Sequence, residues 1–435
     1  MVRSLRLVSC CIPLIVIFWI ALRWQLKSDR SSVIWYTAQT DLSVHTYRHE
    51  SHDLINITWL FEVANPDPII QSLIRASFSH NLYEAKVIPF YRKKKDTFTS
   101  EQITLLTFIT GDRLGRLVAL AERRRAPISV AFYVPPDDET ATQQLFHLDK
   151  LLHDHPVIAW NVDIHLVTSP YLLQLNTWRT VARTFATTDW VLLWDVDFEP
   201  CTDYQKGLEK FLRNTRDKGW ATRLERGEAA LVIPPFEWVD LEVANSRRDV
   251  CPSSKSELAS LYHDLTLDAF ETLNPVLSHA TDYAHLLVAG ETDYYEIKEY
   301  ELGYEVYPIF RRDAPVWFDQ RFVGYGFERS AITAQMYLSG MDLYVLPGEY
   351  AFHVEHSRSS STHRDDIKSV QISWTTFRMD LCHTLGLRLA HKGELHTSAG
   401  ERLVSACQST GIDDIDLDIK RSLWLSGKTS WADSD

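Results

Sequence analysis

Strand-like and helix-like segments alternate along the middle of this 435-residue chain, and this alternation constrains its fold more than any other feature. The apolar, strand-like runs cover residues 103–108, 128–133, 162–167 and 190–194, and the helix-like runs cover residues 114–124 and 177–187. Strand, helix and strand at this spacing predict two βαβ units, and hence the α/β fold class. In the second helix Trp178, Val181, Ala182 and Phe185 recur at helical spacing, so we expect them to face the sheet.

The last of these strands ends in two aspartates, Asp195 and Asp197, which are separated by one residue. Aspartates at this spacing in an extended segment point the same way, so both can face one divalent cation. Ligands of α/β sheets bind at the carboxyl ends of strands, where Asp112 also falls. The pattern therefore favours a metal-bridged diphosphate as the ligand. The alternative is that the two aspartates only begin a loop after a core strand.

Composition narrows the class of function. The chain is 45% hydrophobic and 24% charged, which is typical of a globular protein. Its net charge of -13 argues against nucleic-acid binding, because contacts to phosphates need a basic surface. The two basic runs, at residues 92–95 and 123–125, are short, and we interpret them as solvated faces.

The N-terminus carries an apolar run over residues 7–22 in which Ser9 is the single polar residue. The run is short for a membrane span of about 20 residues. No small-x-small cleavage site follows it, because Arg23 stands where a signal peptidase needs a small residue, so we expect an uncleaved anchor. The predicted organisation is a cytosolic tail at 1–6, a transmembrane anchor at 7–22, a stem at 23–53 and a lumenal body at 54–435.

The cysteines indicate the compartment of the body. Four of the six fall within it, namely Cys201, Cys251, Cys382 and Cys407. An even number in a secretory compartment predicts two disulfides with three pairings open, whereas in a reducing compartment these would be four buried thiols. The Asn-x-Thr sequon at Asn56 agrees with a lumenal body. Because the basic residues on either side of the apolar run are nearly balanced, these features, rather than flanking charge, favour a single-pass type II orientation.

Four blocks of sequence follow one another between about residues 104 and 356. They are TLLTFITGDRLGRLVALAERRRAPISVAFYV, NTWRTVARTFATTDWVLLWDVDFEP, EAALVIPPFEW and YEVYPIFRRDAPVWFDQRFVGYGFERSAITAQMYLSGMDLYVLPGEYAFHVEH. In this order and spacing the chain resembles glycosyltransferase family 49, the family of the LARGE-like and β-1,4-glucuronyltransferase domains. The resemblance implies a GT-A fold, a Rossmann-like mixed sheet flanked by helices. It places a nucleotide-binding half at about residues 100–200, an acceptor half at about 201–360 and a helical C-terminal part at 361–435.

The resemblance also implies an activity, an inverting glycosyltransferase of the Golgi membrane with a UDP-sugar donor, Mn2+ and a glycan or glycoprotein acceptor. It is compatible with a homodimer or with a complex of Golgi enzymes. Glucuronic acid is the donor sugar that the family favours, while xylose, glucose, galactose and N-acetylglucosamine stay open. A glucuronic acid carboxylate calls for a nearby cation, and Arg179, Arg311 and Arg312 could supply it.

The metal site is implied by the same resemblance. Asp195 and Asp197 match the family's Asp-x-Asp, and His353 matches the histidine that completes the site. Two carboxylates, one imidazole and two phosphate oxygens form a shell that suits manganese. The metal would act as a Lewis acid and neutralise the charge that grows on the departing UDP.

Two further segments match positions that contact the nucleotide in the family. Asp112 and Arg113 follow the first strand and resemble the family's Asp-Arg pair. Asn176 and Arg179 open the helix before the metal strand and match its Asn-x-x-Arg. The guanidinium of Arg179 fits a phosphate or an acidic sugar, and the alternative is an ordinary solvent-facing helix residue.

An inverting mechanism requires one carboxylate to take the proton of the acceptor hydroxyl. Two residues are candidates for this base. Asp319 matches the family's Tyr-Asp-x-Arg-Phe, and Glu328 directly follows a Gly-Tyr-Gly-Phe sequence. The family usually has Asn at the position of Glu328, so the choice stays open. Asp319 could instead form a salt bridge to Arg321 or Arg312.

The alternative function is a catalytically silent lumenal protein that keeps the GT-A fold and serves as a binding or scaffolding partner. Retention of Asp195, Asp197 and His353 argues against it, because an inactive site has no reason to keep three such groups buried. Failure to bind Mn2+ and UDP would favour it.

Overall fold

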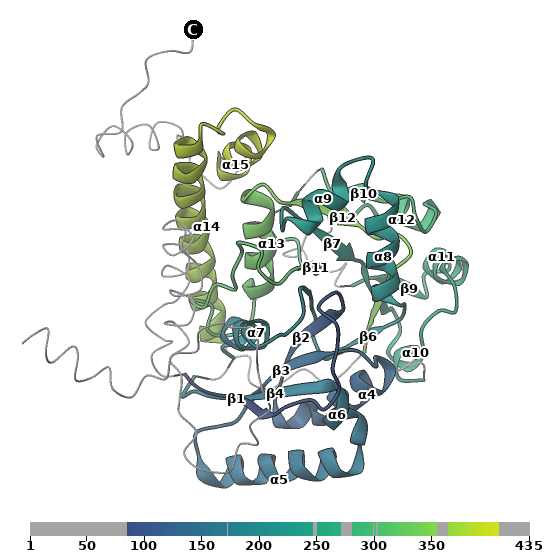
Figure 1. Cartoon of the computed structure of the whole chain (residues 1–435), viewed down its shortest axis with the longest axis vertical. Coiled ribbons are helices and arrows are strands. Elements are labelled where there is room, and N and C mark those ends of the chain that lie inside the picture. The colour runs from purple at the N-terminus through teal and green to yellow at the C-terminus, as the bar shows by residue number, and fades with distance from the viewer. Residues whose placement is uncertain are drawn as a thin grey trace, which may run out of the picture. The chain divides into compact units, whose positions relative to one another are not determined.

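The structure is a computed structural model that describes residues 85–171, 173–246, 250–270, 281–298, 300–301, 303–354 and 364–408 (Figure 1). All of them belong to one unit, Asp53–Asp435. The predicted tail, anchor and stem and the sequon at Asn56 lie outside the described residues. Among the residues that are described, no helix is long and apolar enough to span a bilayer.

A mixed sheet forms the centre of the described chain. Its strands are β1 (Lys86–Arg92), β2 (Ile103–Ile109), β3 (Ile128–Tyr133), β4 (Val162–Thr168), β5 (Trp190–Leu193), β7 (Ala229–Ile233), β10 (Tyr295–Glu296), β11 (Tyr307–Arg311) and β12 (Asp342–Val345). Their order is β1-β4-β3-β2-β5-β11-β7-β12-β10, with β4, β3, β2 and β5 parallel and β11 antiparallel between β5 and β7. The inner strands are buried on both faces, which is why they read as continuous apolar runs. The predicted α/β class is confirmed.

Helices connect the parallel strands. They are the short 3-10 helix Gly111–Arg113 and helices α4 (Leu114–Arg123), α5 (Asp138–Asp154), α6 (Pro156–Asn161) and α7 (Leu175–Thr184). The first predicted βαβ unit is confirmed, since β2 and β3 are parallel neighbours joined through α4. The second differs, because β5 pairs with β2 and not with β4, so the connection through α7 passes over two strands. The strand order therefore reverses between β2 and β5, and a switch point of this kind is where α/β sheets bind ligands.

Helix α7 lies on the face of the sheet formed by β2 and β3. As predicted, Trp178, Val181 and Ala182 are buried, while Phe185 is partly buried. The ring of Trp178 stacks on Tyr133 at a centroid distance of 4.9 Å. This packing fixes the helix that carries the predicted Asn-x-x-Arg motif.

A second, smaller sheet follows the two aspartates. Its strands are β6 (Phe198–Pro200), β8 (Pro235–Trp238), β9 (Leu267–Ala269) and β13 (Ala351–His353), in the order β6-β13-β8-β9. β6 and β13 are antiparallel, with His353 opposite Phe198 and Ala351 opposite Pro200. This register brings the predicted histidine ligand to the strand that begins directly after Asp197.

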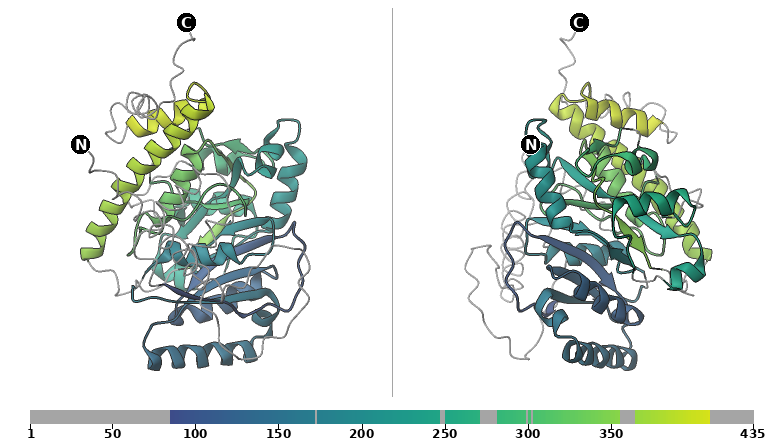
Figure 2. Two further views of the ribbon diagram at one scale, coloured as in Figure 1. Left: turned by 60° about the vertical axis from the view of Figure 1, so that its left-hand side comes forward. Right: turned by 90° about the vertical axis from the view of Figure 1, so that its right-hand side faces the viewer.

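The remaining helices lie in the second half of the sequence. They are α8 (Tyr204–Asn214), α9 (Trp220–Glu225), α10 (Leu241–Ser246), α11 (Lys255–His263), α12 (Tyr283–Val288), α13 (Glu328–Leu338), α14 (Arg364–Lys392) and α15 (Ser398–Gln408). The long helix α14 packs against both α13 and α15 along one side of the fold (Figure 2).

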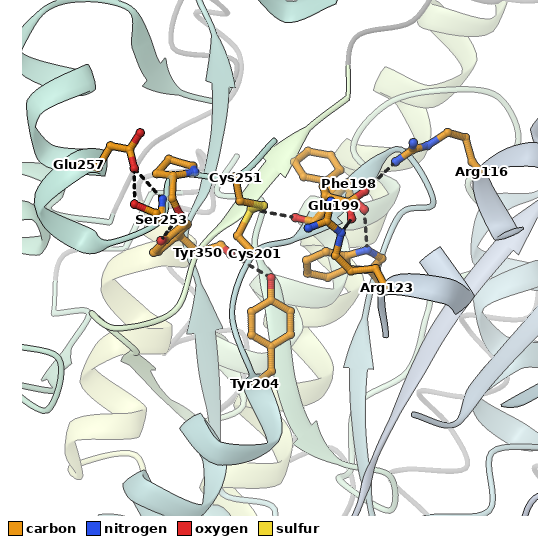
Figure 3. Close-up of a disulfide and its surroundings, with 12 residues drawn as sticks. Arg116, Arg123, Phe198, Glu199, Cys201, Tyr204, Cys251, Ser253, Glu257 and Tyr350 are labelled. Carbon is orange, nitrogen blue, oxygen red and sulfur yellow. Dashed lines mark hydrogen bonds and ion pairs between the residues drawn. A yellow bond between two sulfur atoms is a disulfide. The ribbon is translucent and has the colours of Figure 1, made fainter. Parts of the chain in front are cut away.

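Both predicted disulfides form in the structure, and the pairing is Cys201–Cys251 and Cys382–Cys407. The first joins the end of β6 to the segment before α11, and Figure 3 shows it beside Tyr204 and Tyr350. The second ties α14 to α15. A sequence with four cysteines leaves three pairings open, so only the fold decides between them.

Candidate active site

The two aspartates lie at the switch point, in the short connection from β5 to β6. The amide of Trp194 continues the β5 ladder by donating to the carbonyl of Leu106 at 2.9 Å. The chain then turns, because the amide of Phe198 donates to the carbonyl of Asp195 at 3.1 Å. The prediction that both aspartates lie on an extended segment is therefore wrong. The turn directs them toward different partners.

Asp195 lies between two guanidinium groups. Arg329 donates from Nη1 to Oδ2 at 2.7 Å, and Arg179 donates from Nη2 to Oδ1 at 3.1 Å. The hydroxyl of Tyr307 also donates to Oδ2, at 3.3 Å. Burial by itself would raise the pKa of Asp195, but Arg329 and Arg179 together hold that pKa below its ordinary value. Asp195 is therefore an ionised carboxylate whose two oxygens both have donors.

The two arginines extend this contact into a chain of alternating charge. Arg329 donates from Nε to Oε2 of Glu305 at 2.9 Å. On the other side, Nη1 of Arg179 lies 3.6 Å from Oε1 of Glu328. The order is Glu305, Arg329, Asp195, Arg179, Glu328, and each buried charge has a neighbour of opposite sign. Such pairing offsets the high cost of removing charges from water.

Glu328 is the buried end of this chain. Its Oε2 accepts a hydrogen bond from the amide of Gly326 at 2.8 Å, which ties the carboxylate to the Gly-Tyr-Gly-Phe loop. Burial raises the pKa of Glu328, and Arg179 offsets part of that rise. A carboxyl whose pKa is raised is a better proton acceptor than an ordinary one, because a general base works best with a pKa near the operating pH.

Asp197 has a different partner, Arg113, which donates from Nη1 to Oδ1 at 3.1 Å. Arg113 also lies 3.5 Å from Asp112, which is exposed. The structure thus brings the predicted Asp-Arg pair at the end of β2 together with the second aspartate of the Asp-x-Asp.

Asn176 connects three parts of the site. Its Nδ2 donates to the carbonyl of Asp319 at 2.8 Å and to the carbonyl of Glu328 at 3.0 Å. Its Oδ1 accepts from Nη1 of Arg179 at 3.2 Å. The predicted Asn-x-x-Arg thus acts within the protein: Asn176 is fully buried and fixes both α13 and the guanidinium that binds Asp195. The alternative of a solvent-facing Arg179 is wrong, since that residue is 1% exposed.

Two of the predicted metal ligands, Asp197 and His353, lie on segments that the fold brings together. The amide of Val354 donates to the carbonyl of Asp197 at 2.7 Å, so the histidine and this aspartate lie on adjoining backbone segments. The imidazole packs against Phe198 and Phe270, at centroid distances of 5.1 Å and 4.9 Å, and these two rings also contact each other. A carboxylate and an imidazole carried on adjoining segments are donor types that suit manganese. In the described ranges, however, no group of three or more His, Cys, Asp or Glu side chains is placed to hold a metal.

The carboxylate of Asp319, the other predicted base, pairs with Arg321, which is not part of this chain of charges. Arg321 donates to it from Nε at 3.0 Å and 3.1 Å and from its backbone amide at 2.9 Å. Arg321 then reaches Asp380 of α14 at 2.7 Å. Burial raises the pKa of Asp319 to about 6, against the opposing effect of Arg321. The alternative of a salt bridge to Arg321 is confirmed.

Two predicted cations lie elsewhere. β11 is antiparallel to β5, with Arg311 opposite Trp190, so Arg311 and the following Arg312 lie at the start of β5, while Asp195 follows its end. The prediction that these two arginines approach a donor carboxylate is therefore wrong. Sequence reasoning missed Arg329 instead, and its position directly after Glu328 is the one signal that could have indicated it.

A family model described as a glycosyl-transferase for dystroglycan matches residues 102–174 and 169–385, well over half of the chain. The glycosyltransferase-like protein gnt14 of Dictyostelium discoideum is 29% identical over 265 residues, which are 59% of this chain and 38% of that protein. The xylosyl- and glucuronyltransferase LARGE2 of Rattus norvegicus is 30% identical over 296 residues, 65% of this chain and 39% of that protein. The chain thus spans less than half of the length of these relatives.

Among solved structures, GalNAc-T7 with UDP, GalNAc and Mn2+ aligns with 68% of this chain and 51% of its own chain. The sequence identity is 12% and the TM-score is 0.38. Likeness at this level carries no argument about the site.

Proposed function

Because the chain belongs to glycosyltransferase family 49, described as glycosyl-transferases for dystroglycan, we propose that it is a Mn2+-dependent inverting glycosyltransferase of GT-A type. It moves a sugar from a UDP-sugar to a hydroxyl of a glycan or glycoprotein. The observation that carries the proposal is the buried chain of charges through Asp195 at the switch point of the sheet. It gathers ionised carboxylates and guanidinium groups where α/β folds bind nucleotides.

We assign the metal and nucleotide contacts to the residues around the turn. Asp197 and His353 would hold the metal, which when bound supplies Lewis-acid stabilisation of the diphosphate leaving group. Arg113 lies against Asp197 and is the guanidinium for a phosphate of the donor. Asp112 contacts the nucleotide beside it. Asp195 orders Arg179 and Arg329, which keeps two positive charges in a fixed place while negative charge develops on the leaving group.

We assign the base to Glu328. It takes the proton of the acceptor hydroxyl while the hydroxyl oxygen bonds to the anomeric carbon and UDP departs from the opposite face. The raised pKa of Glu328 supports this role, and so does its link to Asp195 through Arg179. Asp319 is the less favoured base, because Arg321 already occupies its carboxylate.

Glucuronic acid is the donor sugar that we propose. Its carboxylate would need a cation at the site, and of the three predicted arginines Arg179 lies beside Asp195, whereas Arg311 and Arg312 lie at the start of β5. Our proposal for the cellular setting is the Golgi membrane, with residues 7–22 as the anchor of a type II protein.

The test is release of UDP by the full-length chain from UDP-glucuronic acid, UDP-xylose, UDP-glucose, UDP-galactose and UDP-N-acetylglucosamine, with Mn2+ or with a chelator. We expect one donor, UDP-glucuronic acid, to release UDP only with the metal. If UDP binds but no donor releases UDP, the assay is repeated with glycan acceptors present. If no donor releases UDP and the chain also shows no Mn2+-dependent UDP binding, the proposal is contradicted and a scaffolding protein is favoured.

A further inference from the structure

One aromatic side chain next to the proposed base is open to solvent. Tyr325 is 60% exposed, whereas two other aromatic rings near it are packed inside, with Phe322 at 1% and Trp374 of α14 at 8%. A single exposed aromatic residue is ordinary on a protein surface, so exposure alone does not indicate a function. Its distance from Glu328 and the conformation of its loop distinguish Tyr325 from such residues.

The backbone places Tyr325 directly beside the carboxylate of Glu328. The amide of Gly326, which is bonded to the carbonyl carbon of Tyr325, donates to Oε2 of Glu328 at 2.8 Å. Two covalent bonds separate Cα of Tyr325 from that nitrogen, so this Cα lies within about 6 Å of the carboxylate oxygen. The exposed side chain therefore begins next to the group that we assign to the acceptor hydroxyl.

The loop that carries Tyr325 is held on both sides of this residue. The amide of Gly324 donates to the carbonyl of Leu173 at 3.1 Å. On the other side, Phe327 stacks on Trp374, with ring centroids 5.1 Å apart and 9° between the ring planes, where α13 and α14 lie side by side (Figure 1). Three residues of the loop have positive φ, namely Gly324 at +106°, Gly326 at +125° and Phe327 at +59°.

Positive φ suits the two glycines but strains Phe327, and strain of this kind is concentrated at segments that bind ligands. The contacts on either side hold the loop in this conformation. The fold thus fixes the backbone that presents Tyr325 to solvent.

The hydroxyl end of Tyr325 lies among the charges of the site. Desolvation by the surrounding protein raises the pKa of Tyr325, and the carboxylate of Glu328 raises it further, while Arg329 opposes both. Glu305 and Asp195 also raise this pKa. Tyr325 thus combines a ring that is open to solvent with a hydroxyl close to polar groups. Such a side chain suits a ligand that is apolar on one face and polar at its edge.

We propose that Tyr325 binds the acceptor: the C–H face of a neutral sugar ring stacks on the tyrosine ring, and one hydroxyl of that sugar points to Glu328. A sugar ring carries C–H groups on its faces and hydroxyls at its edge, which matches the two parts of this tyrosine. The inference rests on the proposed function, which assigns the base to Glu328. A nucleobase also stacks on aromatic rings, but Arg113, which we assign to the donor, adjoins Asp197 and not Glu328.

The experiment is saturation-transfer NMR on the full-length chain with the methyl β-glycosides of xylose, glucose, galactose and N-acetylglucosamine, with and without saturating UDP and Mn2+. Tyr325→Ala removes the ring, and Tyr325→Phe keeps its face and removes the hydroxyl. The matched control is Phe146→Ala, which removes a ring that is 71% exposed on α5, a helix that carries none of the charge chain. Melting temperatures check that the variants stay folded, as expected for exposed positions.

We expect at least one glycoside to bind, with its affinity lowered at least about tenfold in Tyr325→Ala and changed less than about threefold in Tyr325→Phe and Phe146→Ala. The inference is overturned if no glycoside binds to the wild type or if Tyr325→Ala binds as tightly as the wild type. It is also overturned if Tyr325→Phe loses as much affinity as Tyr325→Ala, because the hydroxyl and not the ring face would then be the contact. A loss of UDP affinity in Tyr325→Ala with glycoside affinity unchanged would place the nucleobase on the ring instead.

UDP binding and UDP release by the wild type are measured separately. If the chain neither binds UDP with Mn2+ nor releases it from a UDP-sugar, the proposed function fails, while a glycoside whose binding needs the Tyr325 ring would still establish the sugar site. If UDP is released but no glycoside binds, the sugar site fails and the proposed function stands.

Discussion

The two ends of the β6–β13 ladder differ in how their buried polar groups are paired. At the His353 end, Asp195 has donors on both oxygens, and the arginines that supply them each contact a further acid. Near the Ala351 end, Glu349 is more deeply buried, and a hydrogen bond from Thr202 and the charge of Lys210 do not offset the effect of burial on its pKa, which rises to about 7.

The difference teaches what each region needs in order to be stable. In the charge chain around Asp195 every charged group lies beside one of opposite sign, so the chain is pre-organised before a nucleotide binds and loses most when one member is removed. Glu349 lacks a comparable pair of guanidinium groups, so its burial favours the protonated carboxyl and makes its contribution to stability depend on pH. Four predictions probe this contrast.

The largest effect should come from Asp197→Asn. Asp195→Asn would leave the buried Arg179 and Arg329 without their shared carboxylate, whereas Asp197 pairs with Arg113, which is more exposed than either, so its loss should spare the fold. We expect donor turnover to fall about 10³–10⁴-fold, because metal stabilisation of the leaving group is worth several kcal/mol. UDP release measures this, with Asp217→Asn on an exposed turn as control. Turnover within a few-fold of wild type would remove Asp197 from the metal site.

Glu328→Gln should lower turnover about 10³-fold, as expected when a general base is lost. The matched variant is Asp319→Asn, which should affect stability more than turnover, because Asp319 serves Arg321. Steady-state rates and melting temperatures of the two variants separate these roles. If turnover were instead lost in Asp319→Asn and kept in Glu328→Gln, Asp319 would be the general base and Glu328 a structural residue.

Arg329→Gln should lower the free energy of unfolding by about 3–5 kcal/mol, because Glu305 and Asp195 would both lose their main partner inside the protein. The control is Arg402→Gln, whose pairs with Glu296 and Asp342 are partly exposed, and there we expect no more than about 1 kcal/mol. Chemical denaturation compares them. Equal losses would mean that the Asp195 cluster is no more tightly coupled than a surface network.

The smallest effect concerns the pH dependence at Glu349. The folded pKa of about 7 lies above the value near 4.5 of a free glutamate, so the folded state holds a proton that the unfolded state releases between these two values. The contribution of this carboxyl to stability is then largest below about pH 4.5 and falls as the pH rises to 7. Glu349→Gln should remove up to about 3 kcal/mol of this loss.

Denaturation of both proteins at several values between pH 5 and 8 measures the difference. Glu225→Gln is the control, because that side chain is exposed, pairs with Arg216 at 2.9 Å and is not among the groups that shift the pKa of Glu349. Parallel pH profiles of wild type and Glu349→Gln would show that the carboxyl is paired or hydrated after all, and the contrast between the two ends of the ladder would disappear.

Part of the candidate site could be predicted from short, contiguous patterns. The strands ending before Asp112 and Asp195 are apolar runs, and the motif residues Arg113, Asn176 and Arg179 lie within a few positions of a strand or helix end. The predicted extended geometry of Asp195 and Asp197 was wrong because a single turn hydrogen bond, from Phe198 to Asp195, decides it. A single backbone hydrogen bond of this kind leaves no periodic pattern in the sequence from which it could be predicted.

The sequence by itself determined the α/β class, the family, four cysteines able to form two disulfides, and the aspartates at the strand end, because these follow from local periodicity and ordered motifs. Only the tertiary structure decided the cysteine pairing, the placement of Arg311 at the far end of β5, and the partners of each carboxylate. Arg329 meets Asp195 across 134 positions of sequence. Such a contact exists only once β5, β11 and α13 are packed together, and burial then makes the choice of partner matter.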